Sequence, residues 1–122
     1  MSGMDGLYEL QGTLESGSVQ STTKVVLNAE HAIFQGHFPG QPVLPGVCMV
    51  QIAIRIASAM RGEALRMREA RSVKFLAPVD PRTAPVLEYR TVLTEKERAW
   101  HADVQALAGD AVVLKLNAEL VP

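Results

Sequence analysis

The sequence predicts an α+β fold in which one antiparallel sheet curls around a single long helix. Three observations predict it: two strand-like stretches open the chain, one strongly apolar helical segment follows Pro45, and alternating stretches fill the remainder. A helix that is apolar on nearly all faces has to be buried, either inside a wrapped sheet or against a second subunit. A length of 122 residues suits a single domain spanning residues 1–122.

The opening elements are expected to form an antiparallel hairpin. Residues alternate between apolar and polar from Leu7, Gly17 and Ser18 mark a turn, and residues 19–27 form a second strand rich in threonine and valine. Residues 28–44 hold four glycines and prolines, too many for a regular element. This segment is nevertheless apolar enough that it must pack on the rest of the domain, which is unusual for a loop.

The buried helix is expected to start at Pro45, because proline is well tolerated at the first helical position. It should run to about Met60 and stop at Gly62. Beyond it, alternation predicts four strands, the last two joined by a turn at Gly109-Asp110. The predicted strands cover residues 71–76, 86–93, 99–107 and 111–120.

Composition excludes several classes of protein. The formal net charge is −1, with 12 basic and 13 acidic side chains, so no charge excess indicates a nucleic acid or membrane partner. The longest apolar run, residues 43–60, is too interrupted for a membrane span. The single cysteine, Cys48, cannot form an internal disulfide, and we expect no signal peptide, because no basic segment followed by an apolar stretch opens the sequence. We therefore expect a cytoplasmic protein.

The most informative segment is residues 34–47, Phe-Gln-Gly-His-Phe-Pro-Gly-Gln-Pro-Val-Leu-Pro-Gly-Val. It resembles the signature loop of the beta-hydroxyacyl-acyl-carrier-protein dehydratases, Phe-x-Gly-His-Phe-Pro-Gly-x-Pro-x-x-Pro-Gly-Val. The resemblance extends roughly from Gly17 to Leu120. It implies a hotdog fold, a dimer whose sheets join edge to edge, and active sites at the dimer interface. Typical members also carry a helix and a Pro-His-Arg-Tyr-Pro-Phe-like segment before the first strand, which we do not find, so a divergent branch is expected.

The resemblance assigns chemistry to this loop. Dehydration takes a proton from the alpha carbon, and His37 is the expected base because histidine titrates near neutrality and an apolar loop keeps it neutral. The alternative is a histidine packed in a turn. The thioester carbonyl gains negative charge, and the family's oxyanion donor is the glycine amide that here is Gly46, at the positive end of the helix. Its other interpretation is a glycine that permits close packing of helix on loop.

The second catalytic residue of the family departs from the pattern. The family has an aspartate or glutamate fourteen positions after the histidine, where this chain has Gln51. Glutamine can orient a hydroxyl group but cannot donate a proton at neutral pH. Three explanations stay open: His37 performs both proton steps, a different hotdog chain supplies the carboxylate, or the protein binds or hydrolyses acyl thioesters without dehydrating them.

The expected activity is dehydration of beta-hydroxyacyl thioesters to trans-2-enoyl thioesters, in fatty-acid or related lipid or polyene synthesis. The expected partners are an acyl carrier protein and a second hotdog chain, in a homodimer, a higher homo-oligomer or a heterodimer. No cofactor is expected beyond the phosphopantetheine, of the carrier protein or CoA, that carries the substrate. The residues expected to contact substrate belong to the signature segment: Phe34, Gly36, Phe38, Pro39, Gly40, Val43, Leu44 and Val47.

The remaining candidates have simpler interpretations. His31 and His101 have no partner at metal-ligand spacing, so no metal site is predicted. Cys48 is expected to be packed and inert in the apolar helix, although a first-turn cysteine sometimes has a lowered pKa. The methionines of the helix are assigned to the core. The arginines at positions 66, 68 and 71 are expected to form a solvated face, with docking of an acidic carrier protein as the alternative.

Overall fold

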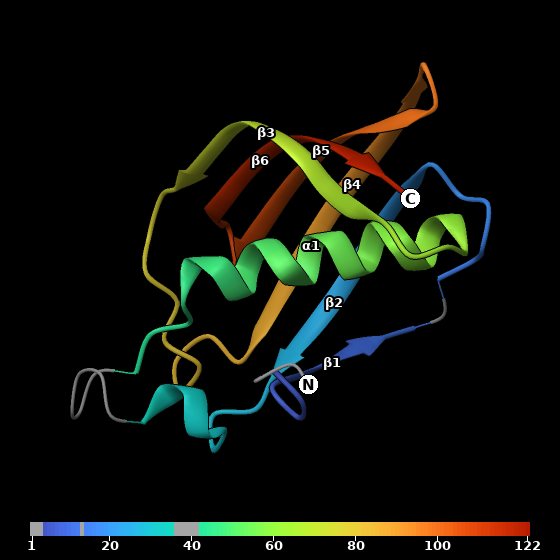
Figure 1. Ribbon diagram of the computed structural model, residues 1–122. Coiled ribbons are helices and arrows are strands. Elements are labelled where there is room, and N and C mark those ends of the chain that lie inside the picture. Colours follow the sequence, from blue (N-terminus) through green and yellow to red (C-terminus); the bar gives the residue numbers. More distant parts are fainter. Residues whose placement is uncertain (1–3, 13, 36–41) are drawn as a thin grey trace.

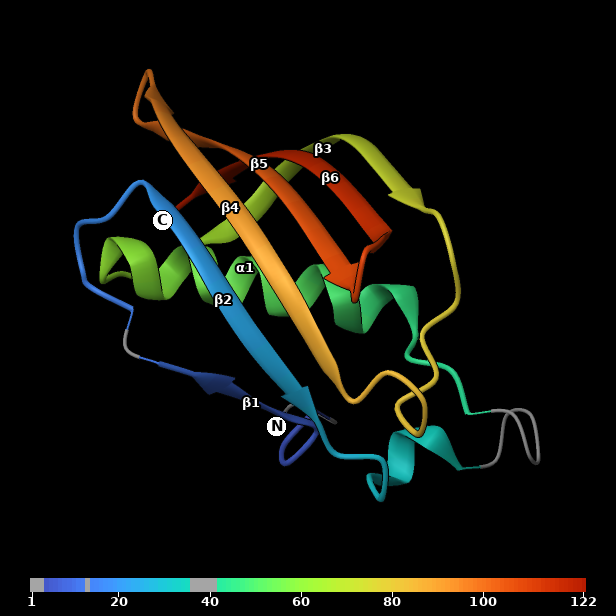
Figure 2. The same ribbon diagram turned by 180° about the vertical axis from the view of Figure 1, so that it is seen from behind.

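The computed structural model describes residues 4–12, 14–35 and 42–122. Within them, six strands form one antiparallel sheet in the order β1-β2-β4-β5-β6-β3, and helix α1 crosses one face of it (Figure 1). Figure 2 shows the opposite face of the same sheet, which no described helix covers. The predicted α+β layout is thus confirmed. The elements are β1 (Tyr8–Gln11), β2 (Gln20–Leu27), the 3-10 turn η1 (Ala32–Phe34), α1 (Gly46–Arg61), β3 (Arg66–Phe75), β4 (Val86–Lys96), β5 (Ala99–Ala108) and β6 (Ala111–Val121).

The two ends of α1 have different causes. Pro45 is extended (φ −60°, ψ 143°) and precedes the helix, which starts one residue later than predicted, at Gly46. Gly62 ends the helix as predicted, because its φ of 69° lies in the left-handed region that favours glycine. Arg61 then fixes this end, donating to the Ser18 carbonyl over 2.9 Å and lying 4.1 Å from the centre of the Trp100 ring.

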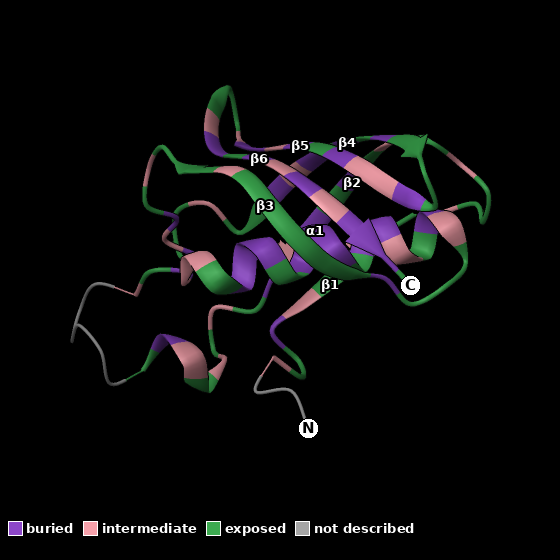
Figure 3. Cartoon of the chain, turned by 45° about the horizontal axis from the view of Figure 1, so that its top comes forward, coloured by how far each residue is buried: buried purple, intermediate pink, exposed green. Residues whose placement is uncertain are grey.

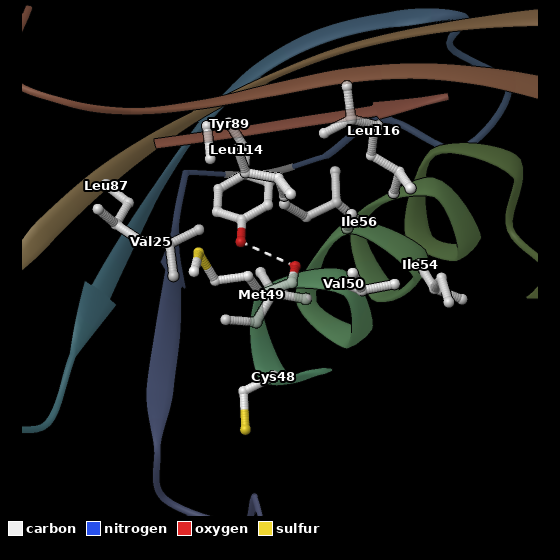
Figure 4. Close-up of a cluster of buried hydrophobic side chains, with 14 of the residues drawn as sticks. Val25, Cys48, Met49, Val50, Ile54, Ile56, Leu87, Tyr89, Leu114 and Leu116 are labelled. Atoms are coloured by element: carbon white, nitrogen blue, oxygen red, sulfur yellow. Dashed lines mark hydrogen bonds between the residues drawn. The ribbon is translucent and has the colours of Figure 1, made fainter. Parts of the chain in front are cut away.

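The core is the contact between α1 and the sheet. Ile52, Ile56 and Met60 are fully buried along the helix face that meets it. Tyr89 of β4 reaches across, and its hydroxyl donates to the Met49 carbonyl over 2.9 Å (Figure 4). Burial raises the pKa of Tyr89 far above its usual value, so this phenol is a permanent donor. The bond satisfies the largest fully buried side chain and links the helix to the sheet.

One face of α1 is exposed, which corrects the expectation that the helix is buried all round. Val47, Gln51, Arg55 and Ala59 recur every fourth residue and are all exposed, Val47 by 67%. We call these four residues the open stripe. Figure 3 shows it as breaks in the buried surface of the helix. The sequence concealed the stripe because two of its members, Val47 and Ala59, are apolar.

Strand β3 lies at one edge of the sheet and starts five residues earlier than the predicted residue 71. Its register with β6 shifts twice, because Arg68 and Arg71 are each an extra residue opposite the neighbouring strand. Both guanidinium groups reach Glu119, at 2.9 and 3.1 Å, and Arg68 is the larger cause of the lowered pKa of Glu119. The two bulges interrupt the alternation from which strands are predicted, which explains the late start.

No helix among the described residues has the length and apolar character needed to cross a bilayer.

The contact between α1 and the sheet predicts where the fold is sensitive. We expect Ile56→Ala to lower the free energy of unfolding by about 2–5 kcal/mol, since it leaves a cavity in the core. Val92→Ala, a matched deletion at a side chain of β4 that is 44% exposed, should change it by less than about 1 kcal/mol. Urea denaturation at fixed protein concentration measures both. Equal losses would show that α1 is not the centre of the core.

Candidate functional site

The signature segment is only partly visible. His37, Gly36, Phe38, Pro39 and Gly40 lie outside the described residues, so their predicted roles stay predictions. The flanks of the segment are described. Phe34 and Leu44 are buried, as expected of a loop that packs on the domain, whereas Val43 and Val47 are exposed.

The start of this loop is held by contacts that sequence reasoning missed. His31 caps η1: its Nδ1 accepts from the Ile33 N–H over 3.0 Å, and its Nε2 donates to the Asp5 carbonyl over 2.8 Å. The Asn28 side chain donates to the Gly6 carbonyl over 3.0 Å. His31 therefore fastens the residues before β1 to the residues after β2. The sequence shows an asparagine and a histidine just after a predicted strand, which is a possible sign of capping. It does not show their acceptors, because these lie more than twenty positions earlier in the chain.

Gly46 begins α1 beside an apolar cavity. Its N–H has no hydrogen-bond acceptor among the described residues, as expected for the first residue of a helix. A cavity of about 450 Å³ adjoins it, lined by Val43, Leu44, Gly46, Met49, Phe75, Leu76, Ala77 and Pro78. The Phe75 ring lies so close that a Cβ on Gly46 would stand 2.7 Å from the ring Cζ atom. The Gly46 amide is thus free, and its missing side chain leaves room for the Phe75 ring; the oxyanion role stays a prediction.

Gln51 lies beside a different cavity, which has a mixed polar and apolar lining. This cavity of about 570 Å³ is lined by Met4, Asp5, Gly6, Tyr8, Leu10, Gln51, Arg55 and Ala59. One wall is formed by three residues of the open stripe, Gln51, Arg55 and Ala59, and the other by β1 and the residues before it. Arg55 forms no ion pair with a carboxylate of the described residues. A guanidinium, a phenol and an amide thus line one hollow.

The two described candidates for catalysis are not brought together within one chain. Gly46 and Gln51 are five residues apart, which places them roughly 140° apart around the helix. They line different cavities.

The cysteine and the methionines of α1 have structural roles. Cys48 is buried, and burial raises the pKa of its thiol, the opposite of what an activated nucleophile requires. This agrees with the packed role expected for it. Met49 and Met60 lie in the core, as predicted. In the part of the chain that the structure describes, no three histidine, cysteine, aspartate or glutamate side chains gather in a way that would hold a metal ion.

Comparison with known proteins adds a relationship to this geometry. A family model described as ApeI-like, ApeI dehydratase, matches residues 13–112. A 3-hydroxyacyl-[acyl-carrier-protein] dehydratase FabZ of Roseobacter denitrificans is 32% identical over 77 residues, which are 63% of this chain and 47% of that protein. The protein of the same name from Campylobacter fetus is 32% identical over 114 residues, covering 82% of this chain and 75% of the relative. The chain thus spans about half the length of the first relative and three quarters of the second.

Solved structures agree on the fold. A chain of the dehydratase heterocomplex ApeI:P from Xenorhabdus doucetiae superimposes with a TM-score of 0.72 and 20% identity, covering 94% of this chain and 98% of that one. This degree of likeness shows the fold: an antiparallel sheet around one helix, the hotdog fold implied by the signature segment.

The close contact between Gly46 and Phe75 predicts that Gly46→Ala has opposite effects on the free energy of unfolding with and without the ring. We expect Gly46→Ala to destabilise the protein by about 1–3 kcal/mol, because the new methyl group displaces the Phe75 ring. In a Phe75→Ala background the same change should be neutral or stabilising by up to about 1 kcal/mol, since alanine is the better helix former. A double-mutant cycle of unfolding free energies measures the coupling. Equal effects in the two backgrounds would show that the ring does not constrain position 46.

Proposed function

This chain belongs to the ApeI-like dehydratase family, and from that premise we propose that it removes water from beta-hydroxyacyl thioesters of an acyl carrier protein or CoA. The product is the trans-2-enoyl thioester. The observation that carries the proposal is the family match over residues 13–112, which includes the whole segment from Phe34 to Val47. In this proposal His37 takes the alpha proton, as a base titrating near neutrality is suited to do.

The surroundings of Gly46 support its part in the reaction. Removal of the alpha proton moves negative charge onto the thioester oxygen, and a fixed donor in a site sheltered from water stabilises that charge. The Gly46 N–H has no acceptor among the described residues, points from the positive end of α1 and borders an apolar cavity. The lining by Val43, Leu44 and Phe75 suits the apolar part of an acyl thioester.

The separation of Gly46 from Gln51 supports a site made by two chains. The open stripe leaves one side of α1 without cover, and the edge strand β3 is almost wholly exposed. A second chain that packs on these surfaces would bury Val47 and bring its own Gln51 toward another chain's Gly46. We propose a dimer as the working unit, formed by two copies of this chain.

A second candidate function is a subunit that works only with a different hotdog chain. Two observations favour it: Gln51 replaces the carboxylate of the family, and the Xenorhabdus doucetiae protein of similar fold is described as a dehydratase heterocomplex. In this version the partner supplies the acid, while this chain supplies His37 and Gly46.

The proposal predicts that the purified chain hydrates enoyl thioesters, the reverse reaction. We expect activity with crotonyl-CoA and longer enoyl thioesters, and a loss of at least about a hundredfold on His37→Ala, because the base is removed. Hydration removes the double bond conjugated with the thioester carbonyl, so the loss of the ultraviolet absorbance of the enoyl thioester measures the rate. Activity that appears only after a second hotdog chain is added would favour the heteromeric alternative, and full activity of His37→Ala would contradict the assignment of the base.

Position 51 gives a separate prediction. If the missing carboxylate limits the rate, Gln51→Glu should raise dehydration by about a hundredfold, the contribution typical of a positioned proton donor. Gln51→Met, of similar size but unable to hydrogen-bond, is the control and should lower the rate. Steady-state kinetics in the dehydration direction measure both. Indifference of the rate to both changes would show that Gln51 does not face the substrate.

A further inference from the structure

The cavity beside Gln51 contains a side chain that can replace the missing acid. We propose that Tyr8 donates the proton that leaves with the beta-hydroxyl group, while Gln51 holds that group in place. The inference rests on the proposed dehydration, with His37 as the base. The new element is that the second proton step belongs to a residue of β1, outside the signature segment and outside the helix that carries the family's acid.

The placement of Tyr8 is the first support. Its strand pairs with β2, where Tyr8 lies opposite Leu27, and its half-buried ring lines the same cavity as Gln51 and Arg55. The phenol is close enough to interact electrostatically with both Arg55 and Tyr89. The Tyr89 hydroxyl is itself bound to the Met49 carbonyl. Tyr8 is therefore held beside the helical turns from Met49 to Arg55, which include position 51.

The Tyr8 hydroxyl is also free to act. It has no hydrogen-bond partner among the described residues, unlike the Tyr89 hydroxyl, which is committed to the helix. Buried tyrosine hydroxyl groups usually have a hydrogen-bond partner. Here a molecule bound in the cavity can supply it. A substrate hydroxyl group offers an acceptor for this donor.

The protonation chemistry fits a proton donor. Burial raises the pKa of Tyr8, so the phenol keeps its proton at neutral pH, and the positive charge of Arg55 acts in the opposite direction. The neutral phenol is thus the form present before the reaction. Once the proton has left, the Arg55 guanidinium faces the phenolate and stabilises it. A half-buried phenol beside a cation can hold its proton before the reaction and is stabilised as a phenolate after it.

Neighbouring groups are less suited to the task. The Gln51 amide has no proton to donate in this range. Asp5 also lines the cavity, but it is an exposed residue, open to solvent, whereas Tyr8 is half-buried. Asp5 is therefore the natural control for Tyr8.

The proposed step balances. The base removes a proton from the alpha carbon, and the electron pair of that C–H bond forms the double bond between the alpha and beta carbons. The C–O bond at the beta carbon breaks, its electron pair stays on oxygen, and the Tyr8 O–H proton joins that oxygen to give water. The imidazolium and the phenolate that remain hold together as many protons as the starting enzyme, and transfer of one proton from the imidazolium to the phenolate through solvent restores it.

The experiment separates the two proton steps. Exchange of the alpha hydrogens of butyryl-CoA in D2O needs the base and the oxyanion donor but no acid, because nothing leaves. Dehydration of 3-hydroxybutyryl-CoA needs both. For Tyr8→Phe we expect dehydration to fall at least about a hundredfold while alpha exchange persists within about threefold. His37→Ala should lose both reactions, and Asp5→Asn should keep both.

The outcomes are distinct. Tyr8→Phe that dehydrates at the wild-type rate, or that loses exchange and dehydration equally, overturns the role of Tyr8 and leaves the proposed function standing. Loss of dehydration alone in Asp5→Asn moves the acid to Asp5 and also overturns it. A wild-type chain that exchanges alpha hydrogens but does not dehydrate, alone or with a second hotdog chain, refutes the proposed function itself, and the inference with it.

Discussion

Helix α1 and the sheet depend on each other for a hydrophobic core. The sheet has one face with no described helix on it, so the apolar side chains of its other face are buried mainly by α1. The helix in turn presents Ile52, Ile56 and Met60 to the sheet, and Tyr89 adds a hydrogen bond from β4 to a helix carbonyl. Most of the surface of this 16-residue helix is buried in the core. Its polar side chains are therefore confined to the exposed side, which is the open stripe.

The stripe determines where the polar side chains of α1 can lie. A polar side chain facing the sheet would be buried without a partner at a cost of a few kcal/mol, so Gln51 and Arg55 belong on the stripe. Gly46 lies elsewhere for a different reason: a free N–H exists only at the start of a helix. The distance around the helix between these two places follows from helical geometry. Within one chain Gly46 and Gln51 therefore stay apart, and a two-chain site follows only when both take part in the reaction, as the resemblance implies.

The elements of the fold could be predicted from sequence where their cause is local. Gly62 ended the helix because its conformation favours glycine, and alternation located β4, β5 and β6 within a few residues. Prediction failed where the cause was not local. The bulges at Arg68 and Arg71 are defined by a partner strand some fifty positions away, and the exposure of Val47 depends on how the helix lies on the sheet. For the same reason, Tyr8 gave no signal: only the fold places β1 beside α1.

The exchange of a carboxylate for Gln51 has a specific physical meaning in this setting. Glutamine has almost the size of glutamate and still offers an acceptor and a donor, so in the proposed site Gln51 orients the hydroxyl group and lacks only the proton. The same exchange removes a negative charge from the neighbourhood of Arg55, one helical turn away. A glutamate at position 51 would stand at the spacing that favours pairing with Arg55. With Gln51 there, the Arg55 guanidinium still opposes the rise in the pKa of Tyr8 that burial causes. In the proposed mechanism, the loss of one acid and the use of another are thus linked through Arg55.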